Sequence, residues 1–243
     1  FTAAPSTNAG NNIFVYYLFR TIGTVTHPPT SALSATSGTF SGNVTIGDAS
    51  AADKKIVFDG NAQDFHIGLD DSADSLTIGL GSALGTTTSM AIDANGIITK
   101  PLQPAFSVHK GGTAQSDITA NDAFYTITWS GERFDQNADF SSNTFTAPVT
   151  GKYFLQLNVR LQQVDTSAGY YILGISTSNE DYRFIFDPDF TVDPVYWGIA
   201  MSVFADMDAN DTVTTSILQQ TGTAQTDIGG SPEYTFFTGF LAC

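Results

Sequence analysis

The chain has 243 residues, a charged fraction of 14% and a formal net charge of −15 from 24 acidic and 9 basic residues. This length accommodates one large domain or two modest ones, and the scarcity of cations argues against binding to a nucleic-acid backbone or an anionic membrane surface. Among the acidic residues only Glu132, Glu180 and Glu233 are glutamate. Because aspartate favours turns and glutamate favours helices, this bias predicts strands and turns.

The first predicted element is a strand at Ile13–Phe19, which is β-branched and aromatic and is followed by the rigid pair Pro28-Pro29. It is the longest apolar run of the chain, yet far shorter than the roughly 20 residues of a membrane-spanning helix, so we expect no membrane insertion. Residues 1–36 are therefore interpreted as an N-terminal strand and linker. Since the first residue is Phe1 and no signal-peptide pattern follows it, we expect a processed or partial chain.

Residues 37–100 contain short strand candidates separated by glycine and aspartate. They are Gly42–Gly47, Lys55–Phe58, Phe65–Leu69, Ser75–Gly79 and Met90–Asp93. A single copy of such strands buries little apolar surface, which predicts a β-rich fibre shaft in which neighbouring chains supply the missing layers. An ordinary small β-domain is the alternative interpretation.

The strands after Lys100-Pro101 are longer and richer in aromatic residues. Tyr153–Leu161 alternates apolar and polar residues and predicts a strand that is buried on one face only. Tyr182–Phe186 and Tyr234–Leu241 are apolar on both faces, so the second face of each needs a hydrophobic partner. A subunit interface would supply it.

Residues 101–243 are interpreted as a head domain. It contains Pro104–Val108, the core Phe145-Thr-Ala-Pro-Val-Thr-Gly-Lys-Tyr153, the turn Asn210–Val213 and the closing segment Phe237–Leu241. Through these motifs the stretch from Pro104 to Cys243 resembles the C1q/TNF-like jelly-roll family. The resemblance implies a ten-stranded sandwich that assembles as a tight three-fold trimer. The chain departs from the family pattern at Asn210-Asp211, where the family usually has Gly-Asp.

The resemblance also implies the trimer interface, because the closing strand of this family lies in the inner sheet. One of two sets should face the three-fold axis: Tyr234, Phe236 and Phe240, or the alternate set, Phe237 and Leu241. The sequence leaves both open.

A second resemblance covers Asp70–Gly79, Asp93–Pro104, the opening Phe1–Pro5 and Val15–Leu18, which are similar to tail-fibre proteins of marine bacteriophages. Together the two resemblances imply an all-β, trimeric chain in which a short-stranded β shaft precedes a C1q/TNF-like jelly-roll head. They imply an extracellular, structural virion fibre subunit that contacts other virion proteins through its N-terminal end. Its tip would bind a host cell-surface receptor, either a glycan or a protein. A cellular C1q-like adhesin or surface filament is the alternative, and a polysaccharide depolymerase is a remote one.

A seven-residue repeat suggests where a receptor binds. Gly112–Ile118 (GTAQSDI) recurs as Gly222–Ile228 (GTAQTDI), and the strand order of the family implies that both copies lie together at the end of the head away from the shaft. The candidate receptor-binding residues are Thr113, Gln115, Asp117, Thr223, Gln225 and Asp227. A coincidence of turn-forming residues is the alternative.

Side chains that could perform chemistry are sparse. Asp206, Asp208 and Asp211 space oxygen atoms like the start of a calcium loop, although Ile217 occupies the position of the closing ligand, so a strand-connecting turn is favoured and Ca²⁺ is the alternative. The three histidines are scattered, and the single cysteine is Cys243. No Walker loop or nucleophile elbow occurs. We therefore expect no enzyme activity, no catalytic residue and no cofactor beyond Ca²⁺.

Overall fold

The computed structural model describes residues 36–118 and 122–243. The predicted strand Ile13–Phe19 lies outside the described residues. Contacts between Cα atoms divide the chain into two units, Phe1–Thr45 and Ile46–Cys243. The boundaries expected at residues 36/37 and 100/101 stay a prediction.

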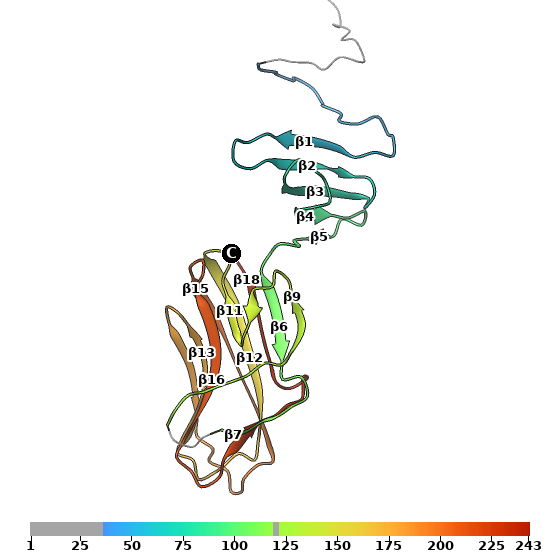
Figure 1. Ribbon diagram of the computed structural model, residues 1–243. Helices are drawn as coiled ribbons and strands as arrows, with labels where there is room; N and C mark the ends of the chain where they lie inside the picture. Colours follow the sequence, from blue (N-terminus) through green and yellow to red (C-terminus); the bar gives the residue numbers. More distant parts are fainter. Residues whose placement is uncertain (1–35, 119–121) are drawn as a thin grey trace, which may run out of the picture. The chain divides into compact units, whose positions relative to one another are not determined.

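All regular secondary structure of the described residues is β, as the excess of aspartate over glutamate predicts (Figure 1). In this part of the chain no helix is long and apolar enough to cross a membrane. The predicted shaft segment forms one antiparallel sheet whose strands pair in chain order. Its strands are β1 (Lys54–Phe58), β2 (Phe65–Asp70), β3 (Ser75–Leu80), β4 (Thr88–Ile92) and β5 (Ile98–Thr99).

Two further sheets form a sandwich. The seven-stranded sheet contains β6 (Ala105–His109), β7 (Gln115–Ile118), β9 (Gly131–Asp135), β12 (Gly151–Gln162), β15 (Tyr196–Met207), β17 (Thr226–Ile228) and β18 (Phe236–Leu241). The six-stranded sheet contains β8 (Tyr125–Thr126), β10 (Phe140–Ser141), β11 (Thr144–Thr146), β13 (Tyr170–Thr177), β14 (Asp181–Phe186) and β16 (Thr212–Gln220).

The strand order identifies the architecture of the sandwich. In one sheet the order is β9-β6-β18-β12-β15, with β17 and β7 continuing beyond the end of β18, and in the other it is β10-β11-β16-β13-β14. Strands adjacent in a sheet are mostly distant in sequence, and the chain crosses repeatedly between the two sheets. This is the arrangement of a jelly roll. The predicted all-β jelly-roll sandwich is confirmed.

The core lies between the two sheets. Along β12 the residues Tyr153, Leu155, Leu157, Val159 and Leu161 have no exposed surface, which confirms the alternation expected from the sequence. Aromatic rings fill one part of this core. The ring centroid of Phe106 lies 4.6 Å from that of Phe145, 5.0 Å from that of Phe237 and 5.2 Å from that of Phe140.

The turn between β15 and β16 contains Asn210, a residue type that suits its backbone conformation. Asn210 has a φ of 75°, in the left-handed region that asparagine tolerates better than most residues. Its backbone N–H donates to the carbonyl oxygen of Ala147 at 2.7 Å. Asparagine is therefore compatible with the conformation of this turn.

Candidate functional site

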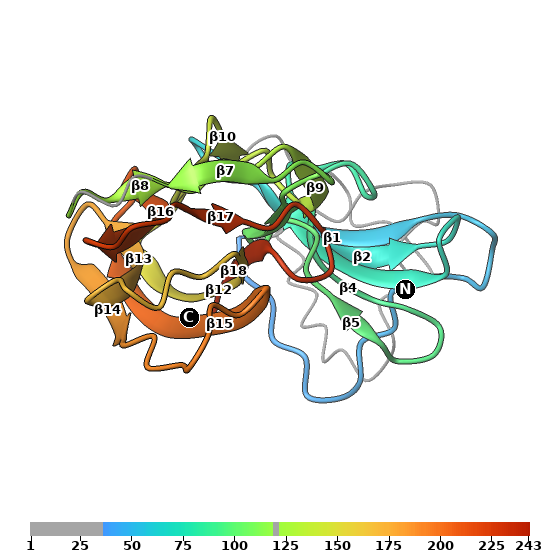
Figure 2. The same ribbon diagram turned by 90° about the horizontal axis from the view of Figure 1, so that it is seen from below.

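The two copies of the repeat lie side by side at one end of the sandwich. The first copy contains β7 and the second contains β17, and these two strands pair antiparallel (Figure 2). The backbone N–H of Asp117 donates to Oδ1 of Asp227 at 2.7 Å, so corresponding residues of the two copies meet. This end of the sandwich lies opposite the C-terminus (Figure 1). The predicted proximity of the two copies is confirmed.

Glycines allow the two copies to approach closely. Gly112 and Gly222 begin the copies with φ values of 97° and 111°, a conformation that side-chain-bearing residues rarely adopt. The N–H of Gly112 donates to the carbonyl oxygen of Gly230 at 2.9 Å. A Cβ atom at Gly230 would collide with the backbone of Thr113 and Ala114. The close packing of Gly230, just after the second copy, against the first copy thus requires glycine at this position.

A buried carboxylate holds the second copy in place. Oδ2 of Asp165 accepts the backbone N–H groups of Thr223 at 2.6 Å and Ala224 at 2.7 Å, and Oδ1 accepts the N–H of Ser167 at 2.8 Å. Asp165 is 1% exposed. Burial by itself raises the pKa of this carboxyl group, but hydrogen bonds from Ser167, Ala224 and Thr223 outweigh it, so the pKa lies below its ordinary value.

Replacing this carboxylate should loosen the second copy. We expect Asp165→Asn to lower the free energy of unfolding by about 1.5 to 3 kcal/mol at pH 7, because hydrogen bonds to a charged acceptor are lost. Since the folded-state pKa is lowered, the contribution is complete above the ordinary pKa of about 4 and is lost as the pH falls through the folded value. The difference in unfolding midpoint between the two proteins, measured from pH 7 to pH 2, should therefore shrink at the acid end. Asp189→Asn, at an exposed aspartate, is the matched control; a difference independent of pH would contradict this account.

Gln115 of the first copy has a structural role. Its Oε1 accepts hydrogen bonds from Nζ of Lys110 at 3.1 Å and from the N–H of Thr128 at 2.9 Å, and its Nε2 donates to the carbonyl oxygen of Thr126 at 2.7 Å. Lys110 is 3% exposed, and burial lowers the pKa of its amine. Gln115 therefore helps to satisfy a buried cation, and its role as a receptor contact stays a prediction.

The other candidate receptor residues differ in accessibility. Thr113, Asp117, Thr223 and Gln225 are exposed. Asp227 is half-buried, and one of its oxygens already accepts the N–H of Asp117. Fewer of the candidate side chains are therefore fully accessible than the sequence indicates. Its role in receptor binding stays a prediction.

The closing strand β18 separates the two sets of candidate interface residues. Phe237 has no exposed surface and lies in the core, and Leu241 packs against that core. Phe240 is 45% exposed, Tyr234 is 53% exposed, and Phe236 is half-buried on the outward side. The interpretation of Phe237 as an interface residue is wrong, because its side chain points between the sheets. The outward set is Tyr234, Phe236 and Phe240.

The outward side of the seven-stranded sheet carries more aromatic residues than the sequence analysis identified. The ring centroid of Phe154 on β12 lies 5.4 Å from that of Phe204 on β15 and 5.5 Å from that of Phe240 on β18. Phe204 is 65% exposed. Nearby, the guanidinium of Arg160 lies over the ring of Tyr196, and also over that of Tyr234. We call the following residues the aromatic face: Phe154, Tyr196, Phe204, Tyr234, Phe236 and Phe240.

Part of this face could have been read from the sequence. Phe154 shares the outward positions of its strand with Gln156 and Asn158, so the two-residue alternation marks it as exposed to a partner. Phe204 could not be placed in this way, because its position beside Phe154 depends on the pairing of β12 with β15.

Neither a family model nor a curated protein matches this sequence. Solved structures do match it. The globular domain of zebrafish complement 1qA protein is 19% identical with a TM-score of 0.40, over 58% of this chain and 98% of the zebrafish chain. Murine APRIL at pH 8.5 is 14% identical with a TM-score of 0.41, over 57% of this chain and 98% of the murine chain.

The three aspartates considered for Ca²⁺ have other partners. Asp206 forms an ion pair with Lys152 at 2.5 Å. Oδ2 of Asp211 accepts the N–H of Asp208 at 2.7 Å and an amide N–H of Asn179 at 2.6 Å, which closes the turn. Within residues 36–118 and 122–243 no group of three or more acidic, histidine or cysteine side chains is arranged to hold a metal ion. These contacts are those of the strand-connecting turn that the sequence analysis favours over the calcium alternative.

Proposed function

We propose that this chain is a structural virion fibre subunit that assembles as a homotrimer and binds a host cell-surface receptor through the tip of its sandwich. The observation that carries the proposal is the aromatic face. It leaves large apolar side chains uncovered on one side of a sheet whose other side already forms the core. A binding role, and not catalysis, is the function that this arrangement supports best.

The aromatic face supports self-association for two physical reasons. Clustered exposed rings are typical of protein interfaces, where aromatic residues are enriched. In addition, the chain carries a net charge of −15, so two copies repel each other wherever carboxylates meet. A face made of aromatic rings is therefore a more favourable place for two copies to touch. Cyclic symmetry lets each copy present the same surface to its neighbours.

The paired repeats support receptor binding at the end of the sandwich opposite the C-terminus. Their exposed side chains are hydroxyls, an amide and a carboxylate, which are groups that hydrogen-bond to sugars and to polar protein surfaces. A trimer would present three such surfaces, and multivalent attachment raises the overall affinity without any new contact. The receptor would therefore be a repeated molecule on a cell surface, a glycan or a protein.

The resemblance of Asp70–Gly79 and Asp93–Pro104 to tail-fibre proteins of marine bacteriophages supports a place on a virion. In such a fibre the N-terminal end attaches to other virion proteins and the sandwich points away from the particle. The protein would then be extracellular as part of the virion.

A binding experiment tests the proposal. The fluorescently labelled full chain should bind cells of a subset of marine bacteria or glycans extracted from their surfaces. The double variant Thr113→Ala with Gln225→Ala should bind at least about tenfold more weakly, because each position acts three times in a trimer. Thr191→Ala, which changes an exposed threonine outside the repeats, is the matched control. Equal binding by the double variant and the control would contradict the assignment of the tip.

A further inference from the structure

The β1–β5 sheet is polar on its buried face and apolar on its exposed face, the reverse of an ordinary soluble sheet. On the buried face His66 is 1% exposed, Thr77 is 2% exposed, and Asp70 and Ser75 are each 7% exposed. Soluble sheets place polar residues toward water because burying them costs free energy unless they are hydrogen-bonded. The inversion therefore requires an explanation on both faces.

The chain itself covers the polar face. The loop that joins β3 to β4 lies over this face, and Nδ1 of His66 lies 2.9 Å from the carbonyl oxygen of Gly81. The backbone N–H of Leu80 donates to the carbonyl oxygen of Thr87 at 3.0 Å and ties the two ends of the loop together. The hydroxyl of Thr77 donates to the carbonyl oxygen of Gly68 at 3.3 Å. Nδ1 of His66 and the hydroxyl of Thr77 thus have partners within the chain, whereas Nε2 of His66 is buried without a hydrogen-bond partner.

The apolar face consists of rows of side chains that lie opposite one another on adjacent strands. Ile56 lies beside Ile67, Ile67 beside Ile78, and Ile78 beside Met90. We call the following residues the open apolar face: Ile56, Phe58, Phe65, Ile67, Leu69, Leu76, Ile78, Leu80, Met90, Ile92 and Ile98.

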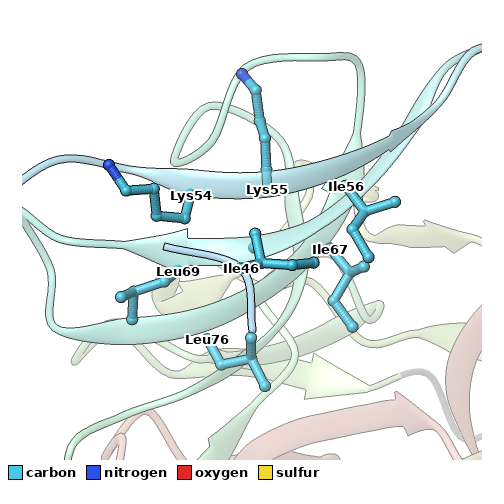
Figure 3. Close-up of a pocket in the computed structure, with 8 residues that line it drawn as sticks. Ile46, Lys54, Lys55, Ile56, Ile67, Leu69 and Leu76 are labelled. Carbon is cyan, nitrogen blue, oxygen red and sulfur yellow. The ribbon is translucent and has the colours of Figure 1, made fainter. Parts of the chain in front are cut away.

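Much of the open apolar face is accessible to solvent. Exposed fractions are 59% for Phe58, 48% for Phe65, 46% for Leu69 and 57% for Ile98. Figure 3 shows Ile56, Ile67, Leu69 and Leu76 pointing to the same side of the sheet, with Ile46 crossing part of it. A hollow of about 220 Å³ remains between these side chains.

The size of the face suits a specific interface. The exposed parts of its seven most accessible side chains amount to on the order of 600 Å², close to the roughly 800 Å² per partner that stable protein interfaces bury. A patch of that size is at the upper limit for a monomeric soluble protein. The face therefore needs a covering partner.

Charge and tethering indicate which partner. Lys54, at the edge of the hollow, is paired with Asp48 at 3.1 Å, so the two opposite charges compensate each other and do not oppose contact between two copies of this face. Only residues 100–104 separate β5 from β6. In a trimer held by the aromatic face, three copies of the sheet would therefore be confined near one another at a high effective concentration.

We propose that the open apolar face packs against the same face of other copies of this chain and forms a second hydrophobic core that no single chain contains. This inference rests on the trimer proposed above, because the tether supplies the partners. The rows of isoleucine, leucine and phenylalanine then form apolar layers shared between chains. Packing between the open apolar faces explains why each sheet buries its polar residues beneath its own loop and leaves its apolar residues accessible.

Cysteine crosslinking of the full chain tests this inference. In a Cys243→Ser background, Ile67→Cys and Ile78→Cys each place one thiol on the open apolar face, and Lys55→Cys places one on the opposite face as a matched control. After oxidation or treatment with a short bismaleimide, a denaturing gel should show covalently joined chains for Ile67→Cys and Ile78→Cys. The joined fraction should exceed that of Lys55→Cys by at least about tenfold, because thiols facing each other in one assembly react at high effective concentration.

Light scattering on the same variants separates the two proposals. A trimer in which neither Ile67→Cys nor Ile78→Cys joins chains would overturn the inference about the open apolar face and leave the proposed trimer intact. A monomer would overturn the proposed assembly and, with it, this inference. A trimer with efficient crosslinking only at Lys55→Cys would place the opposite face at the interface and would also overturn it.

Discussion

Replacing Phe237 by alanine is expected to destabilise the sandwich by about 3 to 5 kcal/mol, the range measured for buried aromatic residues. The side chain has no exposed surface, and its ring centroid lies 5.0 Å from that of Phe106 and 6.2 Å from that of Trp129. Truncation would leave a cavity that the two hydrogen-bonded sheets cannot close. The loss should appear as a lower midpoint of thermal or urea unfolding.

Phe236→Ala provides the matched control for this prediction. Phe236 is the neighbouring residue of β18 but lies on the outward side, where it is half-buried beneath the guanidinium of Arg133. In the Phe204→Asp background, where the chains are expected to be monomers, its loss should change the unfolding midpoint much less than the loss of Phe237. Equal losses for both variants would contradict the assignment of the two faces.

A charged residue at Phe204 is expected to dissociate the proposed trimer while each chain stays folded. Phe204 is 65% exposed in the single chain, and covering it would contribute about 1.5 kcal/mol per copy. Over three copies the loss corresponds to a decrease of about a thousandfold in the association constant. Phe204→Asp should lower the association constant further, because a carboxylate in an apolar interface loses its hydration. Size-exclusion chromatography with light scattering should show monomers at micromolar concentrations.

Ile185→Asp is the matched control for Phe204→Asp. Ile185 is 60% exposed on β14, in the six-stranded sheet, so the substitution adds a similar charge to an equally exposed apolar position outside the aromatic face. This variant should stay trimeric. Circular dichroism should show the same β-sheet content for both variants. If Phe204→Asp also remains a trimer with an unchanged midpoint, the aromatic face does not hold the chains together.

Several features of this protein follow from the sequence alone because they are local. The excess of aspartate over glutamate and the frequent glycines favour turns and strands, and the described residues contain strands only. The alternation from Tyr153 to Leu161 identifies the buried side of β12, because side chains of a strand point alternately to its two sides. The proximity of the two repeat copies followed from the strand order that the family resemblance implies.

Tertiary structure decided which face or role a residue has where the local sequence pattern fits two alternatives equally well. A strand that is apolar on both faces, such as β18, has no polar side to mark its exterior, so only the packing of Phe237 against Phe106 shows which side is the core. Gln115 is another case. Its side chain accepts a hydrogen bond from the buried Lys110, a contact that the sequence pattern does not indicate. Asp206, Asp208 and Asp211 are close in sequence, yet the pairing of Asp206 with Lys152 separates their roles.

The β1–β5 sheet, with its buried polar face and exposed apolar face, shows the same limit of sequence reasoning most clearly. Alternation along β2 and β3 separates Ile67 and Ile78 from His66 and Thr77, but it does not say which side faces water. In a single-chain protein the apolar side would be the interior. Here the chain's own loop covers the polar side, because the pairing of β3 with β4 holds the loop between them beside His66. The alternation therefore came from the sequence, whereas the direction of each face came from contacts between distant segments.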